Sequence, residues 1–177
     1  QQETLFPYTT LFRSELYELH LGQRFEPPET QIAQDVVFGD AIRLVNVSPS
    51  NQQLAYTKVF TWFTWEALQP LDADYKLFVH LIDRETGDLR YNWDAFVMRG
   101  RHGHYGTHLW DAGEFVLDKR VFGLEDPSAL ADIPPGFERY ELRVGFYHPE
   151  TWQRLPVTID GQPVGDSYTL PLYFHIS

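Results

Sequence analysis

The sequence predicts an all-β protein, an antiparallel two-sheet β-sandwich of about eight strands with Ig-like or jelly-roll topology. The first observation is that side chains alternate with a period of two over several segments, as they do along β-strands. The second is that clusters of Gly, Pro, Asn and Asp separate these segments. The third is the scarcity of helix signals, because the one candidate, residues 126–132, stops at Pro134 and Pro135.

The clearest strand covers residues 59–65, where apolar side chains occupy both alternating rows. We therefore expect this strand to be central in its sheet. Residues 75–83 form a second strand, and the turn around Gly87 leads into residues 89–98 as its hairpin partner. Other strands are expected at residues 41–47, 113–121, 139–147, 153–159 and 168–176, with a less regular one at 31–38.

The apolar rows of these strands predict the core. The residues expected to be buried are Trp65, Val79, Leu81, Trp110, Leu142 and Val144. Gly145 lies inside a strand, which is typical of a bulge or of a place where another group approaches the backbone closely.

Five short motifs follow one another along the chain. They are YKLFVHLID at 75–83, THLWDAGE at 107–114, PPG at 134–136, YELRVGFYHP at 140–149 and RLPV at 154–157. Their order resembles the C-terminal extracytoplasmic β-sandwich domain of bacterial membrane glycosyltransferases of the protein-mannosyltransferase type, and of related envelope proteins. The resemblance covers about residues 36–175. It implies a non-catalytic accessory domain in the cell envelope, attached to a membrane protein.

The N-terminal segment has a different origin. Residues 4–14, TLFPYTTLFRS, match the translation of a common short-read sequencing adapter. We therefore expect residues 1–14 to be adapter-derived and exclude them from fold reasoning. Residues 15–35, with Pro27 and Pro28, are expected to be a partly extended lead-in or linker, and residues 36–177 to be the β-sandwich domain.

Composition excludes several classes of protein. The hydrophobic share of 43% and the aromatic share of 16% are typical of a chain that buries a core. A net charge of -11 argues against a nucleic-acid partner, which requires clustered Lys and Arg, and against an anionic membrane surface. The absence of cysteine excludes a disulfide scaffold, a thiolate zinc site and a cysteine nucleophile.

Aromatic residues are the stronger functional signal. Flat, exposed rings on a β-sandwich can stack on the C–H faces of sugars. Most large aromatic side chains are buried in any fold, and Trp65 and Trp110 match positions that the resembling family fills with tryptophan. Trp93, Tyr105 and Trp152 lie close to predicted turns or loops, and they are the candidate carbohydrate-binding residues.

Three histidines in one loop form a second candidate site. His102, His104 and His108 lie within seven residues, and Asp94 or Asp111 could supply a carboxylate ligand to a metal ion. The alternative is a polar, glycine-rich loop at one end of the sandwich, which histidine spacing alone does not exclude. No cofactor is expected.

Signals for catalysis are weak. The chain has no Gly-x-Ser-x-Gly motif, and its paired carboxylates stand beside turn residues, where Asp accepts hydrogen bonds from backbone amides. We therefore expect a non-enzymatic domain whose partner is a glycan or a membrane domain, with no membrane insertion by these residues. It would be an accessory domain of a membrane glycosyltransferase or, alternatively, a carbohydrate-binding module of a secreted or envelope enzyme.

Overall fold

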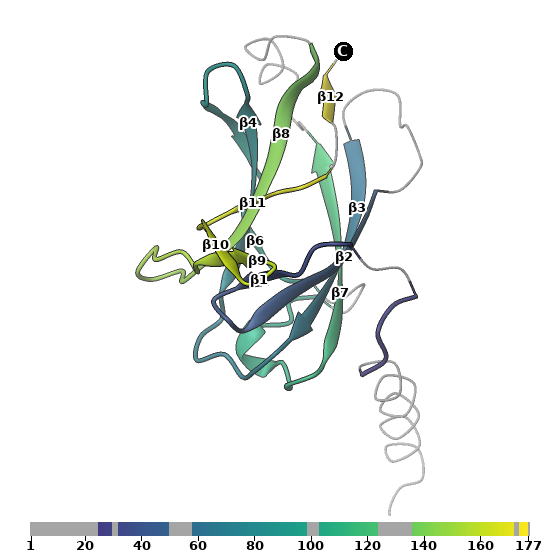
Figure 1. The fold of residues 1–177 in the computed structure, drawn as a ribbon, viewed down its shortest axis with the longest axis vertical. Coiled ribbons are helices and arrows are strands. Elements are labelled where there is room, and N and C mark those ends of the chain that lie inside the picture. The colour runs from purple at the N-terminus through teal and green to yellow at the C-terminus, as the bar shows by residue number, and fades with distance from the viewer. Residues whose placement is uncertain are drawn as a thin grey trace, which may run out of the picture.

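The computed structural model describes residues 25–29, 32–49, 58–98, 103–123, 136–171 and 174–176 (Figure 1). These residues form two antiparallel sheets, which confirms the predicted all-β fold class. Each sheet has six strands. The candidate helix at residues 126–132 lies outside the described part of the chain.

The first sheet, sheet A, has the strand order β10-β9-β1-β2-β3-β7. Its strands are β1 (Val36–Phe38), β2 (Ile42–Pro49), β3 (Lys58–Ala67), β7 (Phe115–Gly123), β9 (Val157–Ile159) and β10 (Gln162–Gly165). The segment predicted to be central, β3, pairs with β2 on one side and β7 on the other.

The second sheet, sheet B, has the strand order β11-β8-β4-β5, with β12 paired to β8 and β6 paired to β4. Its strands are β4 (Lys76–Asp83), β5 (Leu89–Asn92), β6 (Ala95–Phe96), β8 (Gly136–Tyr147), β11 (Tyr168–Thr169) and β12 (Phe174–Ile176). Figure 1 shows β8 as a long strand that crosses much of the molecule. A 3-10 turn, η1 (Thr107–Leu109), stands between β6 and β7.

The described residues contain twelve strands rather than about eight because two predicted strands, at residues 89–98 and 168–176, are each divided in two, and because β10 forms where no strand was predicted. Residues 89–98 do pair with β4 as expected, but they do so in two pieces, β5 and β6. Of the strand expected at 153–159, only the part after Pro156 pairs as a strand, namely β9. Pro171 lies between β11 and β12. Proline has no N–H to donate to a sheet ladder, which accounts for both interruptions.

The core lies between the two sheets and takes side chains from both. All six residues predicted to be buried are buried, which confirms that prediction. Trp65 of sheet A is central: its ring stacks on Phe63 at 5.2 Å and meets Phe146 of sheet B edge-on at 5.0 Å. Such aromatic contacts stabilise the sandwich beyond the area that they bury.

Polar groups are also buried in this interior. Asp118 of β7 is fully buried, and it accepts hydrogen bonds from Arg120 Nε at 2.7 Å and from the backbone N–H of Met98 at 3.1 Å. Arg120 also donates to the carbonyl oxygen of Phe96 at 2.9 Å. Burial raises the pKa of Asp118, although Arg120 acts in the opposite direction. This ion pair ties the strand at the edge of sheet A to the segment around β6 of sheet B.

Candidate functional site

The candidate site lies on the outer face of sheet B, and the alternation of its two longest strands creates it. Along β4, Leu77, Val79 and Leu81 belong to the core. The intervening Phe78 and His80 therefore lie on the opposite face. Along β8, Val144 and Phe146 belong to the core, so Gly145 and Tyr147 share the outer face.

Phe78 is buried on this outer face, outside the main core. In the antiparallel register it stands opposite Gly145, and a Cβ at that glycine would collide with the Phe78 ring. The missing side chain thus lets the Phe78 ring lie across β8, which confirms the predicted close approach at Gly145. The guanidinium of Arg154 covers the ring at 4.4 Å from its centroid, within the range of a cation–π contact.

Trp152 is the most exposed large apolar side chain of the described residues, at 71%. Its ring stacks on Tyr147, with centroids 5.3 Å apart and planes inclined by 9°. One face of the indole is therefore covered by Tyr147, whereas the exposed surface of the side chain is open to a ligand. We call Phe78, His80, Asp94, Tyr147, Trp152 and Arg154 the outer-face cluster.

The backbone of Trp152 is unusual. It has a φ of 61°, in the left-handed region, which is an outlier for a bulky side chain and costs about 1–3 kcal/mol. The turn around it is well bonded: its N–H donates to the His148 carbonyl at 2.8 Å, and the His148 N–H donates to the Gln153 carbonyl at 2.9 Å. The Nδ1 atom of His148 accepts from the N–H of Glu150 at 3.2 Å. Glycine or asparagine is the usual residue at such a position.

Polar groups flank the two stacked rings. His80 Nε2 lies 3.3 Å from Asp94 Oδ1. Burial raises the pKa of Tyr147, and the negative charge of Asp94 with a hydrogen bond to its carboxylate raises it further. Arg154 donates from Nη1 to both carboxylate oxygens of Asp166, at 3.3 and 3.4 Å. The cluster thus combines an exposed ring with hydrogen-bonding groups of both signs.

The structure separates the three predicted carbohydrate-binding residues. Trp152 is exposed on the outer face, whereas Trp93 and Tyr105 are partly buried against the main core. The Trp93 ring lies 5.4 Å from that of Phe122. Tyr105 donates a hydrogen bond from its hydroxyl group to Glu114, which is fully buried, at 3.0 Å. These two side chains therefore do not extend the surface around Trp152.

Four members of the outer-face cluster were not predicted as site residues, namely Phe78, His80, Tyr147 and Arg154. Asp94 was predicted only as a carboxylate ligand for the histidine loop, and in the structure it contacts His80. A signal for some of them was present in the alternation of residues 75–83, which places Phe78 and His80 opposite the core row. The contact between Trp152 and Tyr147 depends on the turn at residues 148–152, whose left-handed residue no composition rule indicates.

The histidines of the predicted metal site are only partly described. His104 Nε2 lies 2.6 Å from Asp74 Oδ2, and its ring packs against Phe96. His108 is exposed within η1, and His102 lies outside the described residues. Among the described residues no group of three His, Asp or Glu side chains is arranged to hold a metal ion. The three-histidine site stays a prediction.

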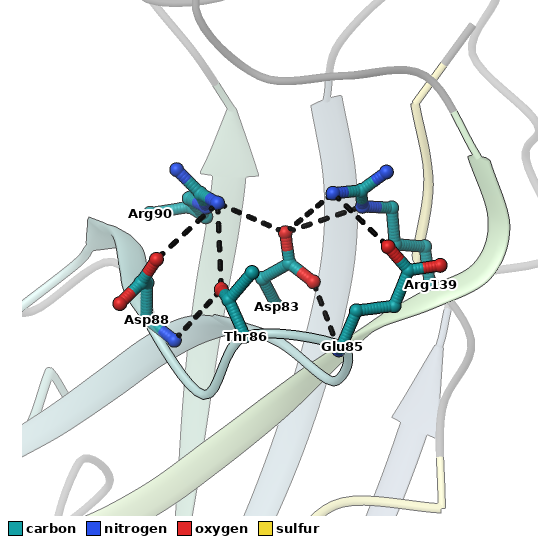
Figure 2. Close-up of polar contacts among 6 residues, drawn as sticks. All are labelled: Asp83, Glu85, Thr86, Asp88, Arg90 and Arg139. Carbon is teal, nitrogen blue, oxygen red and sulfur yellow. Dashed lines mark hydrogen bonds and ion pairs between the residues drawn. The ribbon is translucent and has the colours of Figure 1, made fainter.

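Turn carboxylates have a structural function at the end of β4. Asp83 is fully buried and accepts hydrogen bonds from Arg139 at 2.9 Å, Arg90 at 3.1 Å and the Glu85 backbone N–H at 3.0 Å (Figure 2). Burial on its own would raise the pKa of Asp83, but these donors outweigh it and lower the pKa to about 2. Thr86 completes the network by accepting from Asp88 N–H at 3.2 Å. This carboxylate fixes the β4–β5 turn.

The outer-face cluster is centred on an exposed side chain, that of Trp152. A cleft of about 390 Å³ lies elsewhere, where the segment around Ile32 to Asp35 meets Arg43, Val45 and Glu66 of sheet A. It shares no residue with the cluster. In this cleft Arg43 donates to Asp35 and Glu66, at 2.8 Å in each case, so its charged groups are already paired.

Comparison of the chain with protein-family models and with curated proteins finds no match. Within the described residues, no helix has the length and apolar character needed to span a bilayer.

Proposed function

We propose that the chain is a non-catalytic accessory β-sandwich that binds carbohydrate through the outer-face cluster. The observation that carries this proposal is Trp152, whose ring is 71% exposed although its backbone adopts a left-handed conformation that disfavours a bulky residue. Strain of this kind persists only where the surrounding structure holds it in place, and it gathers at functional positions. A flat, solvent-exposed indole held by a stacked tyrosine is suited to the C–H face of a sugar ring.

The hydrogen bonds of the turn carboxylates support a non-catalytic function. A glycosidase uses two carboxyl groups that face each other across the scissile bond, about 5–10 Å apart. Here Asp83 is occupied by two arginines and a backbone amide, and Asp74 accepts a hydrogen bond from the Thr107 N–H at 3.0 Å. These carboxylates stabilise turns and loops.

The order of the five sequence motifs supports a more specific origin for the domain. It resembles the extracytoplasmic C-terminal domain of bacterial membrane glycosyltransferases, so the native parent would be such an enzyme in the cell envelope. The alternative parent is a secreted or envelope enzyme that carries the domain as a carbohydrate-binding module. With either parent, we propose that the exposed ring of Trp152 makes the contact with the glycan.

The test is titration calorimetry, with ligand-observed NMR, against oligosaccharides of bacterial cell walls and exopolysaccharides. We expect a dissociation constant above about 1 μM, because a shallow surface leaves much of the ligand in water. Trp152→Gly should weaken binding at least about tenfold. The same variant should change the free energy of unfolding by less than about 1 kcal/mol, since lost stacking is offset by relief of the left-handed strain.

The matched control is Trp62, a half-buried tryptophan on the outer face of sheet A, beneath Lys119. Trp62→Ala should leave glycan affinity unchanged. The proposal fails if no oligosaccharide of the panel binds at millimolar concentration, or if Trp152→Gly binds as the wild type does. Glycoside turnover by the purified chain would overturn its non-catalytic part.

A further inference from the structure

Two pairs of charged groups belong to the surface around Trp152. Arg154 is bonded to Asp166, and His80 contacts Asp94. In the described part of the chain, both hydrogen bonds of the Arg154 guanidinium come from Nη1. An anionic ligand that paired with Arg154 would have to displace Asp166, and the exchange of one ion pair for another on the surface gains little.

The net charge of the protein also disfavours an anionic ligand. With a charge of -11, the chain repels polyanions at long range, although salt screens this effect beyond about 8 Å at physiological ionic strength. Close to the ring, Asp166 at 54% side-chain exposure would oppose an incoming carboxylate at short range, where screening is weaker. An anionic sugar is thus disfavoured by both the long-range and the local field.

The stacked pair of rings sets a condition on ligand shape. Tyr147 covers one face of the Trp152 indole, since the two planes are inclined by only 9°. A ligand therefore meets a single flat surface and must present a flat, apolar face of its own. A pyranose whose ring substituents are all equatorial has such a face, lined by axial C–H groups. An axial hydroxyl group projects from one of the two faces of the ring and prevents stacking through that face.

Arg154 and Asp166 also supply the hydrogen-bond donors and acceptors that the hydroxyl groups of a neutral sugar require. The guanidinium has N–H groups beyond those bonded to Asp166, and the exposed carboxylate has acceptor capacity beyond its long contacts with Arg154. Adjacent equatorial hydroxyl groups can donate to Asp166 and accept from Arg154 without breaking the ion pair.

We infer that the outer-face cluster takes neutral, equatorially substituted hexopyranose chains, with Trp152 as the stacking ring and the Arg154–Asp166 pair as the hydroxyl-binding group. This inference rests on the proposed carbohydrate-binding function and specifies its ligand class. Anionic sugars are disfavoured because the Arg154 charge is already paired with Asp166, and an axial hydroxyl group is disfavoured because it removes one of the two faces by which a pyranose can stack on the indole.

Three β-1,4-linked oligosaccharide series of equal length test the inference. The reference is glucose, and the others change one position each: mannose has an axial hydroxyl at C2, and glucuronate a carboxylate at C6. By calorimetry at physiological salt, we expect the glucose series to bind best and the glucuronate series about tenfold more weakly. The mannose series should also bind more weakly than the glucose series, because one of its two stacking faces is blocked. Equal or tighter binding of the mannose or glucuronate series would overturn the inference.

Asp166→Asn is the decisive variant. It leaves the Arg154 charge without its partner, so affinity for the glucuronate series should rise several-fold over that of the wild-type protein. The gain should vanish in the double variant Asp166→Asn/Arg154→Gln, because the guanidinium is then absent. A glucuronate affinity that does not respond to Asp166→Asn would show that pairing is not the source of selectivity.

The outcomes separate the inference from the function on which it rests. If the mannose or glucuronate series binds best and still depends on Trp152, the carbohydrate-binding function stands and the ligand class is wrong. If all three series and the wider glycan panel fail to bind, the proposed function fails and the inference with it.

Discussion

The two faces of β4 and β8 serve different purposes although they belong to the same strands. The inner row, with Leu77, Val79, Leu142 and Val144, is fully buried between the sheets. The outer row combines aromatic, basic and acidic side chains and is topped by an exposed tryptophan. One row is therefore selected for packing, and the other has to satisfy both packing and contact with solvent. The comparison teaches that a period of two can encode a core and a binding surface in one segment.

The inner face should be the more sensitive of the two to loss of volume. Leu142→Ala removes a fully buried side chain and should lower the free energy of unfolding by roughly 2–5 kcal/mol, through lost transfer energy and the cavity that remains. Denaturant unfolding followed by tryptophan fluorescence measures the change. An unaltered midpoint would mean that the inner row does not support the fold, and the contrast between the faces would disappear.

The inner row of β4 ends in a charge, which makes its stability dependent on pH. The pKa of Asp83 is about 2 in the folded protein and 3.8 ordinarily, so the unfolded chain binds more protons between these values. The stabilisation by Asp83 is complete above about pH 4 and is lost as the pH falls through about 2. Asp83→Asn should therefore destabilise the protein at neutral pH and reduce the loss of stability on acidification.

Thermal melts of wild type and Asp83→Asn from pH 7 to pH 2 check this expectation. The matched control is Asp88→Asn, because Asp88 is exposed and contacts Arg90 only at 3.4 Å. If Asp83→Asn and Asp88→Asn give parallel curves at all pH values, the buried carboxylate is not the group that responds to acid.

Sequence alone predicts the inner face much better than the outer one. The six predicted core positions are buried because alternation and apolar character are local properties that survive in any two-sheet packing. The close approach at Gly145 is predictable for a similar reason, since a glycine within a strand leaves a vacancy that another group fills. The alternation of residues 75–83 also predicts which side chains of this strand lie together on its outer face.

The composition of the site depends on contacts that sequence does not encode locally. Trp93 lies within the predicted strand at residues 89–98, and Trp152 lies between two predicted strands. Trp93 packs against Phe122 of the core, whereas Trp152 is exposed. The difference arises from the turn at residues 148–152, which reverses the chain so that Trp152 meets Tyr147. Arg154 reaches Phe78 through the same reversal. Side-chain contacts across a turn that contains a left-handed residue leave no periodic pattern in the sequence, so they could not be predicted from it.

Substitutions of exposed residues on the outer face should change stability little, but an added carbon atom at Gly145, where the face is tightly packed, should destabilise the protein. Gly145→Ala places a Cβ against the Phe78 ring and 2.8 Å from the backbone oxygen of Asp166, closer than carbon and oxygen normally approach. The ring or the strand must shift, and we expect a loss of about 1–3 kcal/mol in the free energy of unfolding. Replacing the Phe78 ring with the smaller leucine side chain removes part of this clash. The double variant Phe78→Leu/Gly145→Ala should therefore lose less free energy of unfolding than the sum of the two single losses. Additive losses in this double-mutant cycle would show that Phe78 does not lie over Gly145, and the outer-face cluster would lose the contact that places Arg154 beside the stacked rings.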